Sequence, residues 1–122
     1  MLLAFRGRNA RSFREEFELS LLATTLAEPG VVREVPWRAG GKPMGVLPVA
    51  GLHGANATGK SNVLRAMADM RNHVLFSFPS ADPRGGMPRR SFLLGTDPAA
   101  PSRYEGGPRA RRGAARVRLR AR

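Results

Sequence analysis

The sequence contains no cysteine, isoleucine or glutamine, and its two histidines, His53 and His73, stand far apart. Without cysteine, neither a disulfide nor a thiolate metal site can form, and two isolated histidines do not make a zinc site by themselves. No stretch approaches the roughly 20 apolar residues of a membrane-spanning helix, and Arg6 and Arg8 interrupt the apolar start before it reaches the length of a secretory signal core. These absences predict a cytoplasmic protein with no membrane partner.

The composition is strongly biased. Of the 122 residues, 42% are apolar, which is enough for one small core. The 19 arginines, 17 alanines, 14 glycines and 10 prolines indicate a GC-rich gene, so the number of arginines alone is a weak argument for function. The net charge of +12 is uneven, because residues 106–122 hold seven arginines and no acidic residue. Nucleic-acid binding therefore has to be considered for this tail separately.

The first part of the chain reads as short strands. Met1–Gly7 and Phe17–Leu22 are apolar stretches separated by a polar connection, and they predict two strands that pair as an antiparallel hairpin. The following segment is rich in proline and glycine, which is typical of a long loop. Within that loop, Val31–Val35 predicts one edge strand.

The middle of the chain combines a strand pattern and a helix pattern. Val46–Leu52 is a nearly continuous apolar run, which predicts a buried parallel strand even though Pro48 cannot donate to a ladder. From Lys60 to about Leu75, apolar residues recur at helical spacing and predict an amphipathic helix, which Pro79 helps to end. A strand, a loop and a helix in this order form the setting of phosphate-binding loops.

The loop between this strand and this helix matches the pattern G-x-x-x-x-G-K-[ST]. Glycines let successive backbone N–H groups turn toward a phosphate, and the helix N-terminus adds a partial positive charge. We expect Lys60 to reach the outer phosphates of ATP and the Ser61 hydroxyl to bind Mg²⁺. The candidate nucleotide-binding residues of this motif are Gly54, Ala55, Asn56, Ala57, Thr58, Gly59, Lys60 and Ser61.

The stretch GANATGKSN resembles the G-x-N-x-x-G-K-S-N loop of ATPase heads in the RecF, SMC and OLD-like group of AAA- or ABC-type ATP-binding proteins. Asn56 and Asn62 favour this group over small nucleoside kinases. The start of the chain, LLAFRGRNARSF, is similar to the opening strand and N-F-R-S loop of the family. The resemblance implies that Asn62, Arg11 and Ser12 lie close to the bound nucleotide. For Arg11 the alternative is an ordinary solvated arginine.

The resemblance covers residues 1–104 and implies an α/β fold, an incomplete P-loop NTPase resembling an ABC-ATPase head. It would comprise N-terminal antiparallel strands, the Walker A strand, loop and helix, and a disordered basic tail. Complete members hydrolyse ATP and dimerise head to head. This sequence has no glutamine for a Q-loop, no apolar run followed by Asp-Glu as in Walker B, and no signature loop like L-S-G-G. We therefore expect ATP binding without hydrolysis by this chain alone.

Residues 105–122 form an arginine-rich tail of low complexity, for which disorder is the expectation. One hypothesis is a shifted reading frame after the Glu105 codon, since a truncated product explains the missing motifs and the sudden charge together. The alternative is a small basic nucleic-acid-binding protein whose tail neutralises the phosphates of DNA. A third hypothesis, a nucleotide kinase, fits poorly because such enzymes usually carry the loop near the N-terminus, whereas 53 residues precede Gly54.

Overall fold

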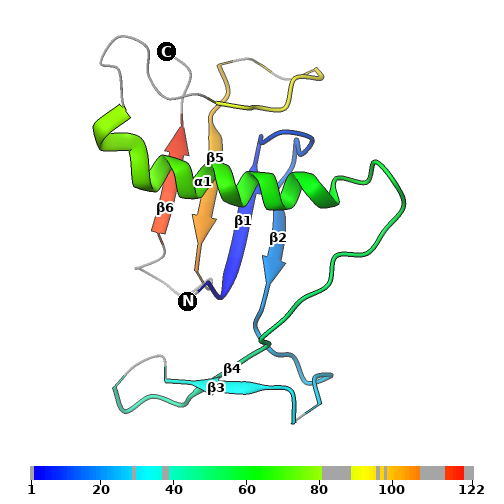
Figure 1. The fold of residues 1–122 in the computed structure, drawn as a ribbon, viewed down its shortest axis with the longest axis vertical. Helices are drawn as coiled ribbons and strands as arrows, with labels where there is room; N and C mark the ends of the chain where they lie inside the picture. The colour runs from blue at the N-terminus through cyan, green and yellow to red at the C-terminus, as the bar shows by residue number, and fades with distance from the viewer. Residues whose placement is uncertain are drawn as a thin grey trace.

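The computed structural model describes residues 2–28, 30–36, 39–80, 89–95, 97, 99–107 and 115–119. Its elements in chain order are β1 (Ala4–Arg8), β2 (Phe17–Ser20), β3 (Arg33–Val35), β4 (Met44–Val46), α1 (Lys60–Ser80), β5 (Ser102–Gly106) and β6 (Ala115–Leu119). One antiparallel sheet has the strand order β2-β1-β5-β6, and β3 pairs with β4 in a second sheet. Figure 1 shows α1 lying across one face of the larger sheet. The described part of the chain is thus a small α/β fold with antiparallel strands and one helix.

The N-terminal hairpin is confirmed. β1 and β2 pair antiparallel, with Phe5 opposite Leu19 and Gly7 opposite Phe17. A Cβ atom at Gly7 would come within 2.6 Å of two ring carbons of Phe17, so the ring lies directly over the glycine backbone. The glycine therefore lets an aromatic side chain of the edge strand cover the central strand.

The core lies between α1 and the sheet. Its buried residues are Phe5, Ala10, Ala66 and Tyr104, with Phe17, Met67 and Met70 packed against them. The Phe5 ring stacks on Tyr104 at a centroid distance of 6.3 Å and meets the Phe17 ring edge-on at 5.7 Å. Burial of each large apolar side chain contributes roughly 1.5–3 kcal/mol. This small aromatic cluster fixes the helix on the sheet.

Asn9 joins the end of β1 to the segment that leads into β5. Its side-chain amide donates to the Ala100 carbonyl at 2.9 Å, and its Oδ1 accepts from the Phe92 backbone N–H at 3.2 Å. Its own carbonyl accepts a hydrogen bond from the buried Ser102 hydroxyl at 2.6 Å. Asn9 has a φ of 49°, a left-handed conformation that asparagine tolerates better than most residues. The chain reversal that follows β1 therefore starts from this residue.

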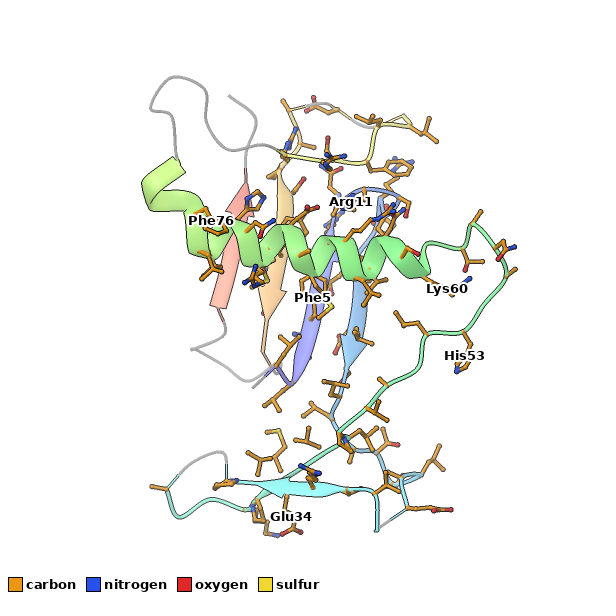
Figure 2. The ribbon with its side chains drawn as sticks, viewed as in Figure 1. Phe5, Arg11, Glu34, His53, Lys60 and Phe76 are labelled. Carbon is orange, nitrogen blue, oxygen red and sulfur yellow. The ribbon has the colours of Figure 1, made fainter. Side chains whose placement is uncertain are left out.

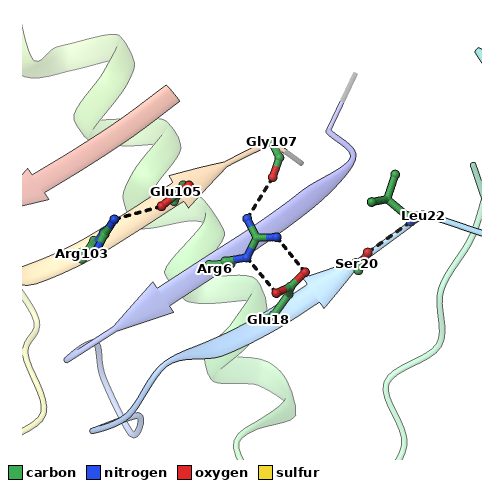
Figure 3. A network of polar contacts seen from close by, with 7 residues as sticks. All are labelled: Arg6, Glu18, Ser20, Leu22, Arg103, Glu105 and Gly107. Carbon is green, nitrogen blue, oxygen red and sulfur yellow. Dashed lines mark hydrogen bonds and ion pairs between the residues drawn. The ribbon is translucent and has the colours of Figure 1, made fainter. Parts of the chain in front are cut away.

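The sheet face away from α1 carries a polar network (Figure 3). Arg6 is 5% exposed, and its guanidinium donates two hydrogen bonds to the Glu18 carboxylate, at 2.8 and 2.9 Å, and a third to the Gly107 carbonyl at 3.2 Å. The hydrogen bonds to Glu18 raise the pKa of Arg6. Arg103 and Glu105 form a further pair at 3.3 Å. An apolar face toward the helix and a polar face away from it are the usual pattern of an antiparallel sheet.

The parallel strand predicted over Val46–Leu52 is wrong. Val46 ends β4, which pairs antiparallel with β3, and residues 47–53 form no strand. Val49 is 76% exposed. A buried parallel strand needs parallel neighbours, whereas the partners of this segment are antiparallel: Val46 pairs with Arg33 and Leu22, and the Leu47 N–H donates to the Leu21 carbonyl at 2.7 Å. Pro48 removes one more donor.

The edge strand and the helix are confirmed. β3 lies within the predicted range Val31–Val35, and α1 begins at Lys60 as predicted. The helix ends at Ser80, beyond the predicted Leu75 and one residue after Pro79. Within the described residues, no helix has the length and apolar character that crossing a membrane requires.

The structure differs from the disorder expected for the tail. Ala115–Leu119 forms β6, which pairs antiparallel with β5 and places Val117 opposite Tyr104. The alternation in ARVRL has the period of two that is typical of a strand, and backbone pairing with β5 does not require a large apolar surface. Residues 108–114 and 120–122 of the tail lie outside the described residues.

Candidate functional site

The predicted phosphate-binding loop lies where an extended segment reaches the start of α1. In Figure 2 that segment, with His53, runs up to the helix, and Lys60 marks the first helical turn. The loop and the beginning of α1 surround a concave site of about 280 Å³. Its lining residues are Asn56, Ala57, Thr58, Gly59, Lys60, Ser61, Asn62 and Arg65. The structure thus brings the motif residues from Asn56 to Asn62 together around one hollow.

The loop backbone takes conformations that favour glycine. Gly54 has a φ of 150° and Gly59 a φ of 93°, and Ala57 between them has a φ of 65°. The Thr58 hydroxyl donates to the Ala55 carbonyl at 2.9 Å and closes the turn from within. A non-glycine residue in the left-handed region is strained, and such strain is concentrated at binding sites. The two glycines of the pattern, Gly54 and Gly59, therefore stand where the backbone geometry requires them.

The N-terminal turn packs against the end of this loop. A Cβ atom on Gly59 would lie 3.1 Å from the Phe13 ring and 3.3 Å from the Ser12 hydroxyl. The Asn62 side-chain amide donates to the same Ser12 hydroxyl at 2.9 Å. The structure therefore places Ser12 beside the loop and gives Asn62 a partner in the protein.

Lys60 folds back over the start of the loop. Its Nζ donates to the Gly54 carbonyl at 2.8 Å and to the Ala55 carbonyl at 2.5 Å. An ammonium group has three donors, so one N–H remains for an anion. Gly54 and Ala55 do not line the hollow itself, and their role in this structure is to hold the lysine. The predicted lysine is consequently fixed at the edge of the site.

The N-terminus of α1 opens toward the same hollow. The backbone N–H groups of Asn62 and Val63 donate to the Gly59 carbonyl at 2.9 and 3.1 Å. Those of Lys60 and Ser61 donate to no backbone carbonyl of the described chain. The first turn holds no acidic residue, so nothing on the helix offsets the partial positive charge of this end. The Ser61 side chain is exposed beside it.

Arg11 is turned away from the loop. Its guanidinium forms a bidentate pair with Asp69, with Nε 2.7 Å and Nη2 2.8 Å from the two carboxylate oxygens. Asp69 stands nine residues along α1 from Lys60, which corresponds to about 13 Å of helix. The hydrogen bond to Asp69 raises the pKa of Arg11. The structure therefore brings Ser12 to the loop but not the charged end of Arg11, and the arginine is paired rather than freely solvated.

Arg65 lines the hollow, and the sequence pattern does not include it. It follows Ser61 by four residues, so the two positions share one face of α1. The spacing was readable in the sequence, but among 19 arginines nothing singled this one out. The site thus holds a second cation besides Lys60.

Two buried titratable groups, His73 of α1 and Tyr104 of β5, lie apart from the lining of the hollow. Burial raises the pKa of Tyr104 to about 12. Burial also lowers the pKa of His73, whose ring lies 6.2 Å from the Tyr104 ring, and Asp69 opposes part of this effect. Both groups are therefore uncharged near neutral pH and belong to the core.

The residues present fit a phosphate-bound Mg²⁺ better than a site built by the protein alone. Among the described residues, no three or more histidine, aspartate or glutamate side chains gather as metal ligands. Mg²⁺ commonly binds through one or two protein oxygens together with phosphate oxygens and water. The exposed Ser61 hydroxyl beside the helix N-terminus can supply one such oxygen.

Comparison with known proteins finds no matching family model, no matching curated sequence and no matching solved structure.

Proposed function

We propose that this protein binds ATP together with Mg²⁺ through the loop Gly54–Ser61. The phosphates would lie in the hollow at the start of α1, and Lys60 and the free helix N–H groups would contact their oxygens. The Ser61 hydroxyl would be a ligand of Mg²⁺. The hollow has a volume of about 280 Å³ and is lined by seven residues of the predicted loop and helix start, which supports this proposal.

The observation that carries the proposal is the placement of Lys60. Its ammonium group is held by two carbonyls at the beginning of the loop, which leaves one N–H beside a helix N-terminus with no acidic residue in its first turn. Both groups carry positive charge at the same place.

Binding without turnover is part of the proposal. Phosphoryl transfer depends on a residue that positions the attacking nucleophile and on charges that stabilise the transition state. The sequence lacks the Asp-Glu motif, the Q-loop and the signature loop, and the described residues hold no acidic cluster that would replace them. We propose that the chain on its own holds ATP and does not hydrolyse it.

The relation to P-loop ATPase heads of the RecF, SMC and OLD-like kind is likewise a proposal. It is supported by the GANATGKSN letters and by the antiparallel strands, whose connecting turn puts Ser12 against Asn62. A complete head of this kind would dimerise and hydrolyse ATP. The test is calorimetric titration of Mg-ATP into the protein, with Lys60→Ala as the variant that should lose binding.

A second candidate function, nucleic-acid binding, rests on the seven arginines of residues 106–122. Residues 115–119 of this tail form β6 at the edge of the sheet, and they include two of the arginines. Arg116 lies opposite Glu105 and Arg118 opposite Arg103 in the ladder. An ordered strand would present the arginine-rich segment at a fixed place on the fold. Binding of this kind weakens steeply with salt, whereas ATP binding in the loop depends on Lys60.

A further inference from the structure

Arg65 is the cation of α1 that the sequence motif leaves out and that the fold places in the hollow. It lines the site together with Lys60 and Ser61, and its side chain is exposed. Within the part of the chain that the structure describes, it forms no ion pair and no side-chain hydrogen bond. Its guanidinium is therefore open to solvent and has no partner among the described residues.

The neighbouring arginines lie elsewhere. Arg11, which the sequence predicts at the nucleotide, is paired with Asp69. Arg71, the next arginine of α1, lines an apolar cavity of about 640 Å³ between the helix and the ends of β1 and β5. Arg71 lies six residues from Arg65, which is about 9 Å along the helix. Arg65 is thus the arginine of α1 that faces the loop.

The chemistry of a polyphosphate calls for more than one cation. ATP carries several negative charges, and Lys60 has a single N–H left once the loop carbonyls are satisfied. An arginine guanidinium has five donors in a planar fork that matches two phosphate oxygens at once. Arg65 stands one turn beyond Ser61, on the same face of the helix.

We propose that Arg65 is a second phosphate-binding residue of the site, which donates to phosphate oxygens of the bound triphosphate. This inference rests on the proposed function and extends it, because it replaces Arg11 with Arg65 as the arginine at the ligand. It also implies that the site recognises the phosphate chain. The binding affinity for an inorganic triphosphate should therefore depend on Arg65 as much as the affinity for ATP does.

The experiment compares Arg65→Ala, Arg65→Lys and Arg71→Ala with the unmodified protein. Calorimetric titration measures the Kd of Mg-ATP and of Mg-tripolyphosphate at low salt, and circular dichroism checks that each variant is folded. We expect Arg65→Ala to raise the Kd of both ligands by roughly tenfold or more, which is the scale of a lost hydrogen bond to a charged group. Arg65→Lys should retain part of the affinity, and Arg71→Ala should change either Kd by less than about twofold.

The outcomes separate this inference from the proposed function. If the unmodified protein binds neither ligand, the proposed function fails and this inference fails with it. If the unmodified protein binds both ligands and Arg65→Ala behaves like Arg71→Ala, the loop binds phosphate but Arg65 does not, and only the inference is overturned. If Arg65→Ala weakens the binding of ATP alone and leaves the binding of tripolyphosphate unchanged, Arg65 contacts the nucleoside, and the inference is overturned in this case too.

Discussion

Arg11 and Asp69 form a two-bonded ion pair that ties the N-terminal turn to α1. The two nitrogen–oxygen distances are 2.7 and 2.8 Å, and the side chains are 16% and 20% exposed. Arg11 also has a φ of 53°, and its backbone N–H donates to the Arg90 carbonyl at 2.8 Å. The turn beside the loop is therefore held at three places: by Asp69, by Arg90 and, through Ser12, by Asn62.

Replacing Asp69 by alanine should lower the free energy of unfolding by about 2 kcal/mol. The reason is that the partly buried Arg11 guanidinium loses two charge-assisted hydrogen bonds. Urea unfolding followed by circular dichroism measures this change. Arg8→Ala is the control, because the Arg8–Glu15 pair is longer, at 3.6 Å, and exposed on both sides. It should change stability by less than about 0.5 kcal/mol, and equal effects of the two substitutions would contradict the assigned role of the Arg11–Asp69 pair.

Gly59→Ala should damage the loop more than an alanine at another glycine of positive φ. Gly59 has a φ of 93°, and a Cβ atom there would press on Phe13 and Ser12. Gly40 has a φ of 73°, and a Cβ atom there would meet no other atom within 4 Å. Both substitutions add backbone strain of about 1–2 kcal/mol, but the first also pushes the N-terminal turn off the loop.

Calorimetric titration of Mg-ATP into both glycine variants tests this expectation. Gly59→Ala should weaken binding by at least about tenfold, since a displaced turn and a strained residue 59 would disturb the hollow that Gly59 lines. Gly40→Ala should leave the affinity unchanged. Comparable affinity in the two variants would show that the contact between loop and turn does not shape the site.

Stability should fall as the pH drops below the ordinary pKa of histidine, near 6.5, because burial lowers the pKa of His73 in the folded state. Between the lowered pKa of His73 and 6.5, the unfolded chain binds more protons than the folded chain. The free energy of unfolding therefore rises with pH in this window, and the protein loses stability as the pH falls through it. Urea midpoints at pH 7.5 and 5 measure this dependence. His73→Asn should flatten it, whereas His53→Asn, at an exposed position, should not. An unaltered pH dependence in His73→Asn would count against the buried histidine.

The tail predicts a separate, salt-sensitive interaction. Arg109, Arg111, Arg112, Arg120 and Arg122 lie outside β6, so replacing them by glutamine spares the strand that pairs with β5. If the tail binds DNA, fluorescence anisotropy with a labelled duplex should show affinity that falls steeply with salt and is largely lost in this variant. Mg-ATP binding should remain. Equal DNA affinity before and after the substitutions would remove the second candidate function.

The N-terminal hairpin and the start of α1 could be predicted because both depend on residues that are close together in the sequence. The hairpin follows from two apolar stretches around a polar turn, and the start of α1 follows from the loop letters and the helical spacing after Lys60. The segment Val46–Leu52 failed because a parallel strand depends on neighbours that its own letters do not contain. After the buried Val46, which ends β4, the same run is compatible with the exposed path through Val49 and Leu52 that the structure has.

Side-chain partners at the site could not be read from the sequence. Arg11 and Asp69 are 58 residues apart, and Ser12 and Asn62 are 50 apart, so their pairing depends on how the sheet and the helix pack. The motif includes the loop residues but not Arg65. Arg65 lines the hollow because α1 continues from the loop and carries it one turn beyond Ser61 on the same face. β6 was hidden for another reason, because its strand alternation lies in an arginine-rich stretch that composition alone assigns to disorder.

The most direct test of the central claim uses the two lysines of the sequence. Lys60 is held at the loop, and Lys42 is exposed in the connection that precedes β4, so Lys42→Ala removes the same charge away from the site. Calorimetric titration of Mg-ATP should show binding by the unmodified protein and by Lys42→Ala, and a loss of at least about tenfold in Lys60→Ala. Equal Kd values for the two lysine variants, or no binding by the unmodified protein, would contradict the proposal that this loop binds ATP.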